Sequence, residues 1–181
     1  MLGLGALTLA GCTTTPMAGA DTPEKRKEID SAVNSTMNKL YSTVRHSREL
    51  VDKAHGVLVF PSVLAAGFFV GGEYGEGALR VGGKTEGYYS TATGSLGLQI
   101  GAQSKAIIFL FMTQAALDKF RSSQGWTAGA DASVAVIKAG ANGDIDLNTA
   151  TNEVEVIVMT NQGLMANLNI EGTKVTKLKT R

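Results

Sequence analysis

The chain has 181 residues, of which 44% are hydrophobic and 18% charged, and its formal net charge is +1. This composition is typical of a globular domain, and the balanced charge excludes a protein that attracts nucleic acid through a bulk positive field. With one cysteine and two histidines, the chain also lacks the residues for a disulfide framework or a Cys/His zinc cluster.

The first residues are typical of a bacterial lipoprotein signal. Leu9-Ala10-Gly11-Cys12 follows a short apolar stretch and matches a lipobox, in which small residues precede the cut and the cysteine thiol accepts a diacylglycerol. The stretch is far shorter than the ~20 residues of a membrane-spanning helix. We therefore expect a signal peptide at residues 1–11, a tether at 12–21 and a single domain at 22–181.

Residues 22–54 predict an amphipathic helical arm. Thr22 supplies a capping hydroxyl, and Pro23 suits the first helical position. Apolar residues then recur mostly every three or four positions, in one long helix or in two that join near Ser42-Thr43. These positions are Ile29, Val33, Met37, Leu40, Tyr41, Val44 and Val51.

Basic side chains lie off the apolar stripe of this arm and are candidates for binding acidic lipid headgroups. They are Lys25, Arg26, Lys27, Lys39, Arg45 and Arg48. The alternative is a solvated helix face, because Arg45 and Glu49, Arg48 and Asp52, and Glu49 and Lys53 are each spaced for internal pairing. We favour the solvated face for residues 45–53 and leave Lys25 to Lys27 open. The tail from Gly172 to Arg181, with four basic residues and no acid, is a rival patch.

From Gly56 onward, short apolar and β-branched runs alternate with glycine turns. One helix interrupts them at residues 114–122, capped by Thr113, and Asn161-Gln162-Gly163 predicts a tight hairpin. The predicted strands are 56–60 with a stop at Pro61, 64–74, 78–81, 87–93, 95–102, 105–112, 126–137, 153–160 and 163–170, with an added edge strand at 174–178. The predicted turns are 75–77, 82–84 and 103–104.

Glycine is unusually frequent, with 22 residues, and many of these lie inside apolar segments. Such glycines favour bent or bulged strands. We therefore predict an α+β fold: a strongly bent antiparallel sheet, closed or nearly closed into a barrel, with an N-terminal amphipathic helical arm and one short inserted helix.

Two motifs suggest ligand sites but lack their structural context. Residues 78–85 match a relaxed phosphate loop, yet the residues after Glu86 favour a strand over the required helix, so a Gly-Gly hairpin turn is predicted instead. Thr149 stands where a calcium loop requires glycine, so we favour a polar surface loop there and leave calcium open. The residues with calcium-loop spacing are Asp144, Asp146, Asn148, Asn152 and Glu155. No catalytic set is recognisable, so we expect no enzyme activity, no cofactor and no metal.

Four motifs, in order, resemble the SYLF domain, over about Glu28 to Gly172. They are Gly56–Ser62, Ala66–Gly77, Ser95–Ser104 and Gly129–Ala135. This family occurs in bacterial lipoproteins and beside SH3 or FYVE domains in eukaryotic proteins. Its members are described as lipid-binding, with phosphoinositide binding attributed to a basic N-terminal segment, and some fungal members also bind actin.

The resemblance implies a lipid-binding module whose segment 25–53 lies nearest the membrane. We expect a non-enzymatic lipid- or membrane-binding lipoprotein of the bacterial envelope, with anionic headgroups as partners and no nucleic acid. Thr13, rather than Asp, follows the cysteine, and by the usual sorting pattern this indicates the outer membrane, facing the periplasm or the cell surface. The alternative is a structural or surface-exposed interaction protein that uses its lipid only as an anchor.

Overall fold

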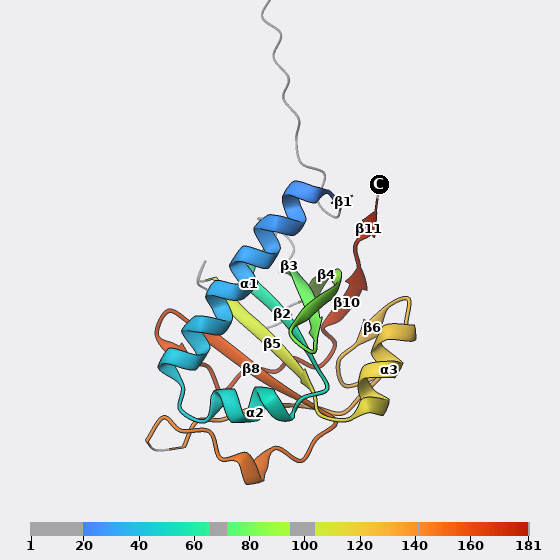
Figure 1. Ribbon diagram of the computed structural model, residues 1–181. Coiled ribbons are helices and arrows are strands. Elements are labelled where there is room, and N and C mark those ends of the chain that lie inside the picture. Colours follow the sequence, from blue (N-terminus) through green and yellow to red (C-terminus); the bar gives the residue numbers. More distant parts are fainter. Residues whose placement is uncertain (1–19, 66–71, 95–103, 141, 181) are drawn as a thin grey trace, which may run out of the picture.

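The computed structural model describes residues 20–65, 72–94, 104–140 and 142–180. Within these ranges the chain forms an α+β domain in which helices cover both faces of a strongly curled sheet (Figure 1). The helices are α1 (Pro23–Thr43), α2 (Ser47–Lys53), α3 (Gln114–Ser122) and a short 3₁₀ turn, η1 (Leu147–Thr149).

The helix ends follow the local sequence signals. The Thr22 hydroxyl accepts a hydrogen bond from the Lys25 backbone N–H at 3.3 Å, so the predicted cap is confirmed. The arm divides into two helices after Thr43, where His46 takes a left-handed conformation with φ of 61°. Thr113 caps α3 as expected, and its hydroxyl accepts from the Ala116 N–H at 3.1 Å.

The strands make one large mixed sheet and one small pair. The large sheet has the order β6-β10-β4-β3-β2-β5-β8-β7, with β9 added to β8, while β1 pairs in parallel with β11. The bounds are β1 Ala20–Asp21, β2 Gly56–Ala65, β3 Gly72–Val81, β4 Lys84–Gly94, β5 Lys105–Phe111, β6 Trp126–Thr127, β7 Val134–Val136, β8 Val154–Thr160, β9 Gly163–Leu164, β10 Lys174–Lys177 and β11 Lys179–Thr180.

The sheet is strongly curled, as predicted, but it is an open half-barrel, so full closure into a barrel is wrong (Figure 1). The predicted strand 126–137 divides into β6 at one edge of the sheet and β7 at the other, and no described residues join these edges in a ladder. Seven residue steps separate Thr127 from Val134, so the two edges are at most ~25 Å apart along the chain. This short link requires the strong curl of the sheet. The pairing of β7 with β8 is parallel, so the prediction of an all-antiparallel sheet is also wrong in this place.

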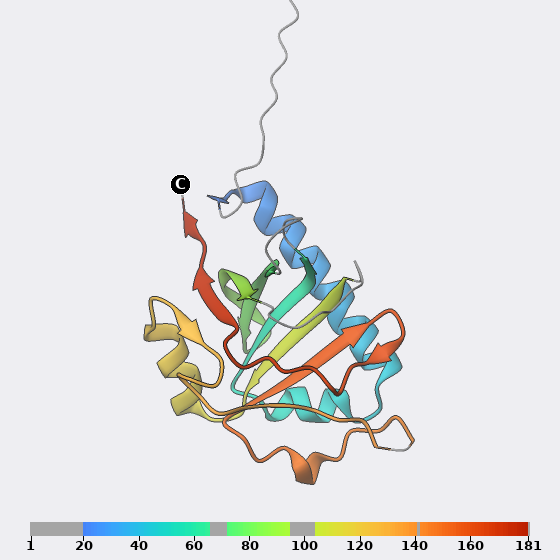
Figure 2. The ribbon, with the colours of Figure 1, turned by 180° about the vertical axis from the view of Figure 1, so that it is seen from behind.

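Each face of the sheet carries its own hydrophobic core. On one face α1 and α2 pack against Val59, Ile108 and Ile157, and on the other α3 packs against Phe109 and Phe111 (Figures 1 and 2). All seven residues of β5 are buried, because the strand lies in the middle of the sheet and is covered on both sides. Alternate residues of β5 therefore serve the two cores.

The strand that begins at Gly56 does not end at Pro61, and residues 75–77 do not form the predicted turn. β2 continues through Pro61 with a bulge between Val59 and Ser62, where the missing N–H of proline breaks no regular ladder. Gly77 lies within β3, and a Cβ atom there would overlap the carbonyl oxygen of Val59. The absence of a side chain at Gly77 lets β3 approach the bulged β2. Gly82 and Gly83, with φ of 59° and 79°, form the expected hairpin turn.

Three other predicted strands differ from the structure or lie outside the described residues. β10 lies between β6 and β4, so the segment 174–178 is not an edge strand. The predicted strand 163–170 is shortened to β9, although its hairpin with β8 is confirmed by the pairing of Thr160 with Gly163. The predicted strand 95–102 and the first residue of the turn at 103–104 lie outside the described residues.

Candidate membrane-facing site

The apolar stripe of α1 is part of the domain core. Ile29, Val33, Met37 and Leu40 are each no more than 8% exposed and pack on the sheet. Burying one such side chain contributes about 1.5–3 kcal/mol, so turning this face toward a bilayer would forfeit much of the core energy. The helical arm is therefore a layer of the fold, and only its polar face is open to a ligand.

Polar contacts fix α1 to the β3–β4 hairpin. Asp30 accepts hydrogen bonds from the hydroxyls of Tyr88 at 2.6 Å and Thr85 at 2.9 Å, and Arg80 donates to the Asn34 side chain at 2.6 Å. Partial burial, and then the Asp30 contact, raise the pKa of Tyr88 to about 12, which keeps its hydroxyl a donor.

Two of the basic candidates at the start of α1 are neutralised within the protein. Lys25 forms an ion pair with Glu76 at 2.7 Å, and Arg26 makes two contacts with Asp21, at 2.5 and 2.7 Å. The Asp21 hydrogen bond raises the pKa of Arg26. For Lys25 and Arg26, which the sequence left undecided, the structure shows internal pairing, while the neighbouring Lys27 is exposed.

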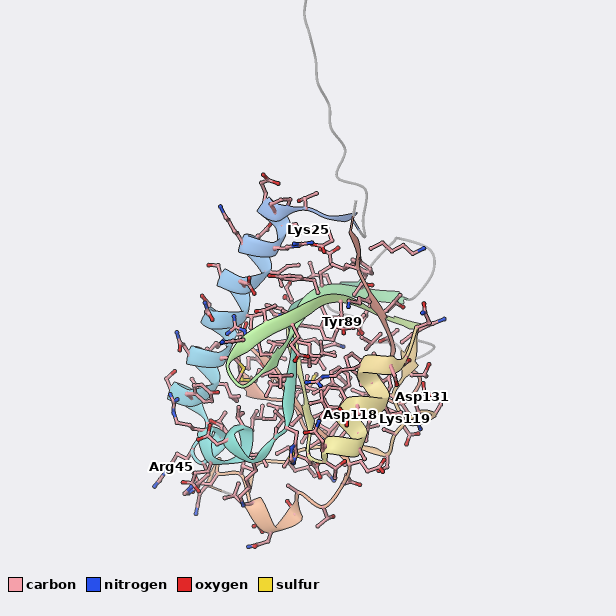
Figure 3. The ribbon with its side chains drawn as sticks, turned by 45° about the vertical axis from the view of Figure 1, so that its right-hand side comes forward. Lys25, Arg45, Tyr89, Asp118, Lys119 and Asp131 are labelled. Carbon is pink, nitrogen blue, oxygen red and sulfur yellow. The ribbon has the colours of Figure 1, made fainter. Side chains whose placement is uncertain are left out.

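The other basic candidates lie at the far end of the helical layer. Lys39 donates to the Asn161 side chain at 3.4 Å, Arg45 lies 3.6 Å from Asp144, and Arg48 stacks over the Tyr41 ring at 4.0 Å. A 21-residue helix is about 30 Å long, and Figure 3 shows Lys25 and Arg45 at its opposite ends. The six sequence candidates therefore do not converge on one site.

The predicted internal pairs of the α1–α2 region are absent from the described residues. Within 4.0 Å, Glu49 contacts His46 instead of Arg45 or Lys53, and Arg48 contacts an aromatic ring rather than Asp52. Arg45 lies among the non-helical residues after Thr43, which breaks its helical spacing to Glu49, whereas Arg48 lies within α2 and stacks on Tyr41 of α1.

The rival patch in the C-terminal tail has exposed charges. Lys174, Lys177 and Lys179 are all exposed on β10 and β11, and none forms an ion pair within the described part of the chain. The parallel pairing of Ala20 with Lys179 brings the segment predicted as a tether to this tail (Figures 1 and 2). The entry of the chain into the domain and its basic tail therefore lie at the same end.

One apolar side chain near the start of α1 is also unusually open. Leu64 is 46% exposed and is the one exposed large hydrophobic residue in the described ranges. It pairs with Tyr74 in the β2–β3 ladder, and the Tyr74 hydroxyl donates at 3.0 Å to Glu76, the partner of Lys25. The sequence did not identify Leu64, because strand periodicity alone does not reveal where a covering helix ends.

The residues of the suspected calcium loop make contacts with other groups of the protein. Asp144 lies near Arg45, Asp146 caps η1, and the buried Glu155 accepts a hydrogen bond from the Asn152 backbone N–H at 2.8 Å. In the described ranges no three His, Cys, Asp or Glu side chains form a metal-binding group. The other discounted motif, residues 78–85, lies in the β3–β4 hairpin with no helix after it, and Cys12 lies outside the described residues.

Comparisons with known proteins identify the family. No helix in the described ranges combines the length and hydropathy needed to cross a membrane. A search of curated proteins gives no match. Residues 92–180, which include α3 and the strands from β5 to β11, match the Ysc84 family, described as "Las17-binding protein actin regulator". Residues 92–180 therefore match the Ysc84 family, which is the SYLF-domain family that the sequence resembles.

Proposed function

We propose that this protein is a non-enzymatic, membrane-binding lipoprotein of the bacterial cell envelope, anchored in the outer membrane through Cys12. One observation carries the proposal: the β1–β11 pairing sets the basic tail beside the point where the chain from Cys12 enters the domain. Eight residue steps from Cys12 to Ala20 span at most ~28 Å, so an acylated Cys12 would hold this end of the domain close to the bilayer.

The membrane-facing residues in this proposal are Lys177 and Lys179 on the C-terminal strands, Lys27 on α1, and Leu64 on β2. A basic residue near an anionic surface contributes about 1 kcal/mol, within a Debye length of about 10 Å at 0.1 M salt. Glu24 and Glu28 are exposed on α1 close to Lys27, so the two strand lysines supply more of the attraction. Leu64 adds an apolar contact with the interface.

Vesicle flotation tests this proposal. A chain beginning at Thr13 has no acyl chain but keeps every described element from β1 to β11. We expect it to float with phosphatidylglycerol vesicles at low salt, to be released at high salt, and not to float with phosphatidylcholine vesicles. Absence of flotation with either lipid would contradict headgroup binding.

The second candidate function is protein binding, with the lipid serving only as an anchor. It is favoured by the description of the matched family, which names binding to a protein. In that case the acylated protein is held on membranes by its lipid, whereas the chain beginning at Thr13 does not bind vesicles of either composition.

A further inference from the structure

A pocket of about 580 Å³ lies between α1, α2, β2 and the β3–β4 hairpin. Its volume falls within the range of roughly 300–1,000 Å³ that is usual for small-molecule sites. The pocket uses the second half of α1, from Asn34 to Tyr41, and therefore lies away from the Lys25 end of that helix. It is separate from the membrane-facing end, so an inference about it does not rest on the proposed function.

The floor of the pocket is apolar. Met37 of α1, Val51 of α2 and Val59 of β2 line it, and each is at least nine-tenths buried. These side chains belong to the core between the helices and the sheet, so the floor is held in place by the packing of the domain. An apolar ligand body placed against this floor would be removed from water.

One wall of the pocket is cationic and pre-oriented. Arg80 donates to the Asn34 side chain at 2.6 Å and to the Asp30 backbone carbonyl at 3.3 Å, which fixes the plane of its guanidinium. The Arg80 Nε atom is buried and has no hydrogen-bond acceptor among the described residues. The two Nη atoms each use one hydrogen in these contacts, and their remaining hydrogens are suited to a carboxylate or a phosphate.

Tyr41 lies close to a second guanidinium. The Arg48 side chain stacks over the Tyr41 ring at 4.0 Å, and Tyr41 lines the pocket together with Arg80. Burial raises the pKa of Tyr41, so its hydroxyl remains protonated at neutral pH. The Tyr41 hydroxyl can therefore donate to the same anion that Arg80 attracts.

Two acids lie near these guanidinium groups. Asp30 lies 3.9 Å from Arg80, at the limit of an ion pair, and its oxygens point toward the hydroxyls of Thr85 and Tyr88, from which they accept hydrogen bonds. Asp52 also lines the pocket and is exposed to solvent, where water screens its repulsion of an anion.

We propose that this pocket binds a small anionic amphiphile, with its carboxylate or phosphate-ester head at Arg80 and Tyr41 and its apolar body on Met37, Val51 and Val59. The head is recognised by paired donors and the body by burial, so both parts of the ligand contribute to affinity.

Calorimetric titration of the chain beginning at Thr13 tests the pocket. The probes are decanoate, decyl phosphate and the uncharged decyl glucoside, all below their micelle concentrations, so that the carboxylate and phosphate arms distinguish the two head groups. We expect saturable binding of at least one anionic probe, at least tenfold tighter than binding of the glucoside. Arg80→Gln should remove this preference for the anion.

A filling variant keeps the test independent of Arg80, whose loss also weakens contacts to α1. Asn38 is exposed at the pocket, so Asn38→Trp should reduce anionic binding at least tenfold by occupying the space. The matched control is Ser35→Trp on an exposed position of α1 that does not line the pocket, and it should change affinity less than twofold.

Three results would overturn the pocket assignment: no binding of either anionic probe, equal binding of the glucoside, or anionic binding that survives Asn38→Trp. Vesicle flotation of the same variants separates the two proposals. Asn38→Trp should float like the unaltered chain, whereas failure of the unaltered chain to float would count only against the membrane-facing end.

Discussion

The Tyr88 hydroxyl donates a 2.6 Å hydrogen bond to the Asp30 carboxylate, and this bond joins strand β4 to helix α1. The Thr85 hydroxyl contacts the same carboxylate, while Arg80 reaches the backbone of Asp30. Together with the buried apolar stripe of α1, these contacts make the helix an integral layer of the domain. The helix therefore presents its polar face outward and keeps its apolar face against the sheet.

Removing this contact should loosen α1. Tyr88→Phe deletes the hydroxyl and leaves Asp30 with Thr85 as its remaining hydroxyl donor. Because the site is only partly buried, we expect a loss of about 1 kcal/mol in the free energy of unfolding. Urea denaturation followed by circular dichroism measures it, and an unchanged unfolding midpoint would show that the bond contributes nothing net.

Two tyrosines, Tyr74 and Tyr88, predict lower stability of the folded protein at alkaline pH. The pKa values of Tyr74 and Tyr88 are raised to about 12 in the folded protein, against about 10 in an unfolded chain. Below about pH 10 both states keep these protons, so the contribution to stability is constant. Between about pH 10 and 12 the unfolded chain releases them first, so stability should fall as pH rises. In Tyr88→Phe this fall should be shallower, and a steeper fall would contradict the assignment.

Gly77 should be intolerant of any side chain. A Cβ atom would overlap the Val59 carbonyl oxygen and lie 2.8 Å from the Phe60 ring, both on the bulged strand β2. Overpacking of this kind, against backbone rather than a flexible side chain, should cost about 3 kcal/mol in Gly77→Ala. Gly125→Ala is the matched control, because its new methyl group would meet only the Lys174 side chain at an ordinary 3.5 Å. Thermal unfolding of both variants measures this difference. Equal melting temperatures would contradict the close approach of β3 to β2.

The anchor has its own test. Cys12→Ala removes the thiol that would accept the lipid, so the altered protein should remain soluble or uncleaved. Each buried CH₂ of an acyl chain adds about 0.8 kcal/mol to membrane affinity, which makes anchoring by two or three chains firm. Metabolic palmitate labelling should succeed for the unaltered protein and fail for Cys12→Ala. Equal labelling of both proteins would remove the lipobox interpretation.

The sequence predicted the elements whose signals are local. Thr22 and Pro23 marked the start of α1, the two glycines at positions 82 and 83 marked a hairpin, and continuous apolar runs marked β5 and β8. It did not predict the division of residues 126–137 between the two sheet edges. Gly129, with φ of 85°, was the available signal, because it marks the turn at which the chain leaves β6.

The ion pairs of the basic residues were predicted less well than the fold, because ion pairing depends on tertiary contacts. Lys25 forms an ion pair with Glu76 on β3, which is far away in the sequence. Helical spacing therefore could not reveal that the charge of Lys25 is neutralised. The tail lysines became the better candidates only through the β1–β11 pairing. Two-residue strands such as these carry almost no periodicity from which pairing could be inferred.

Vesicle flotation of two charge-reversal variants tests the central claim most directly. In the chain beginning at Thr13, Lys177→Glu with Lys179→Glu reverses the proposed membrane-facing end. Lys39→Glu with Arg45→Glu makes the same change in net charge at the far end of the helical layer. Circular dichroism must show that both variants are folded.

With phosphatidylglycerol vesicles at low salt, the account predicts that the tail reversal abolishes flotation and that the far-end reversal leaves most of it intact. Flotation that survives the tail reversal but is lost in the Lys39 and Arg45 variant would contradict the account, and would move the membrane-facing surface to the opposite end of α1.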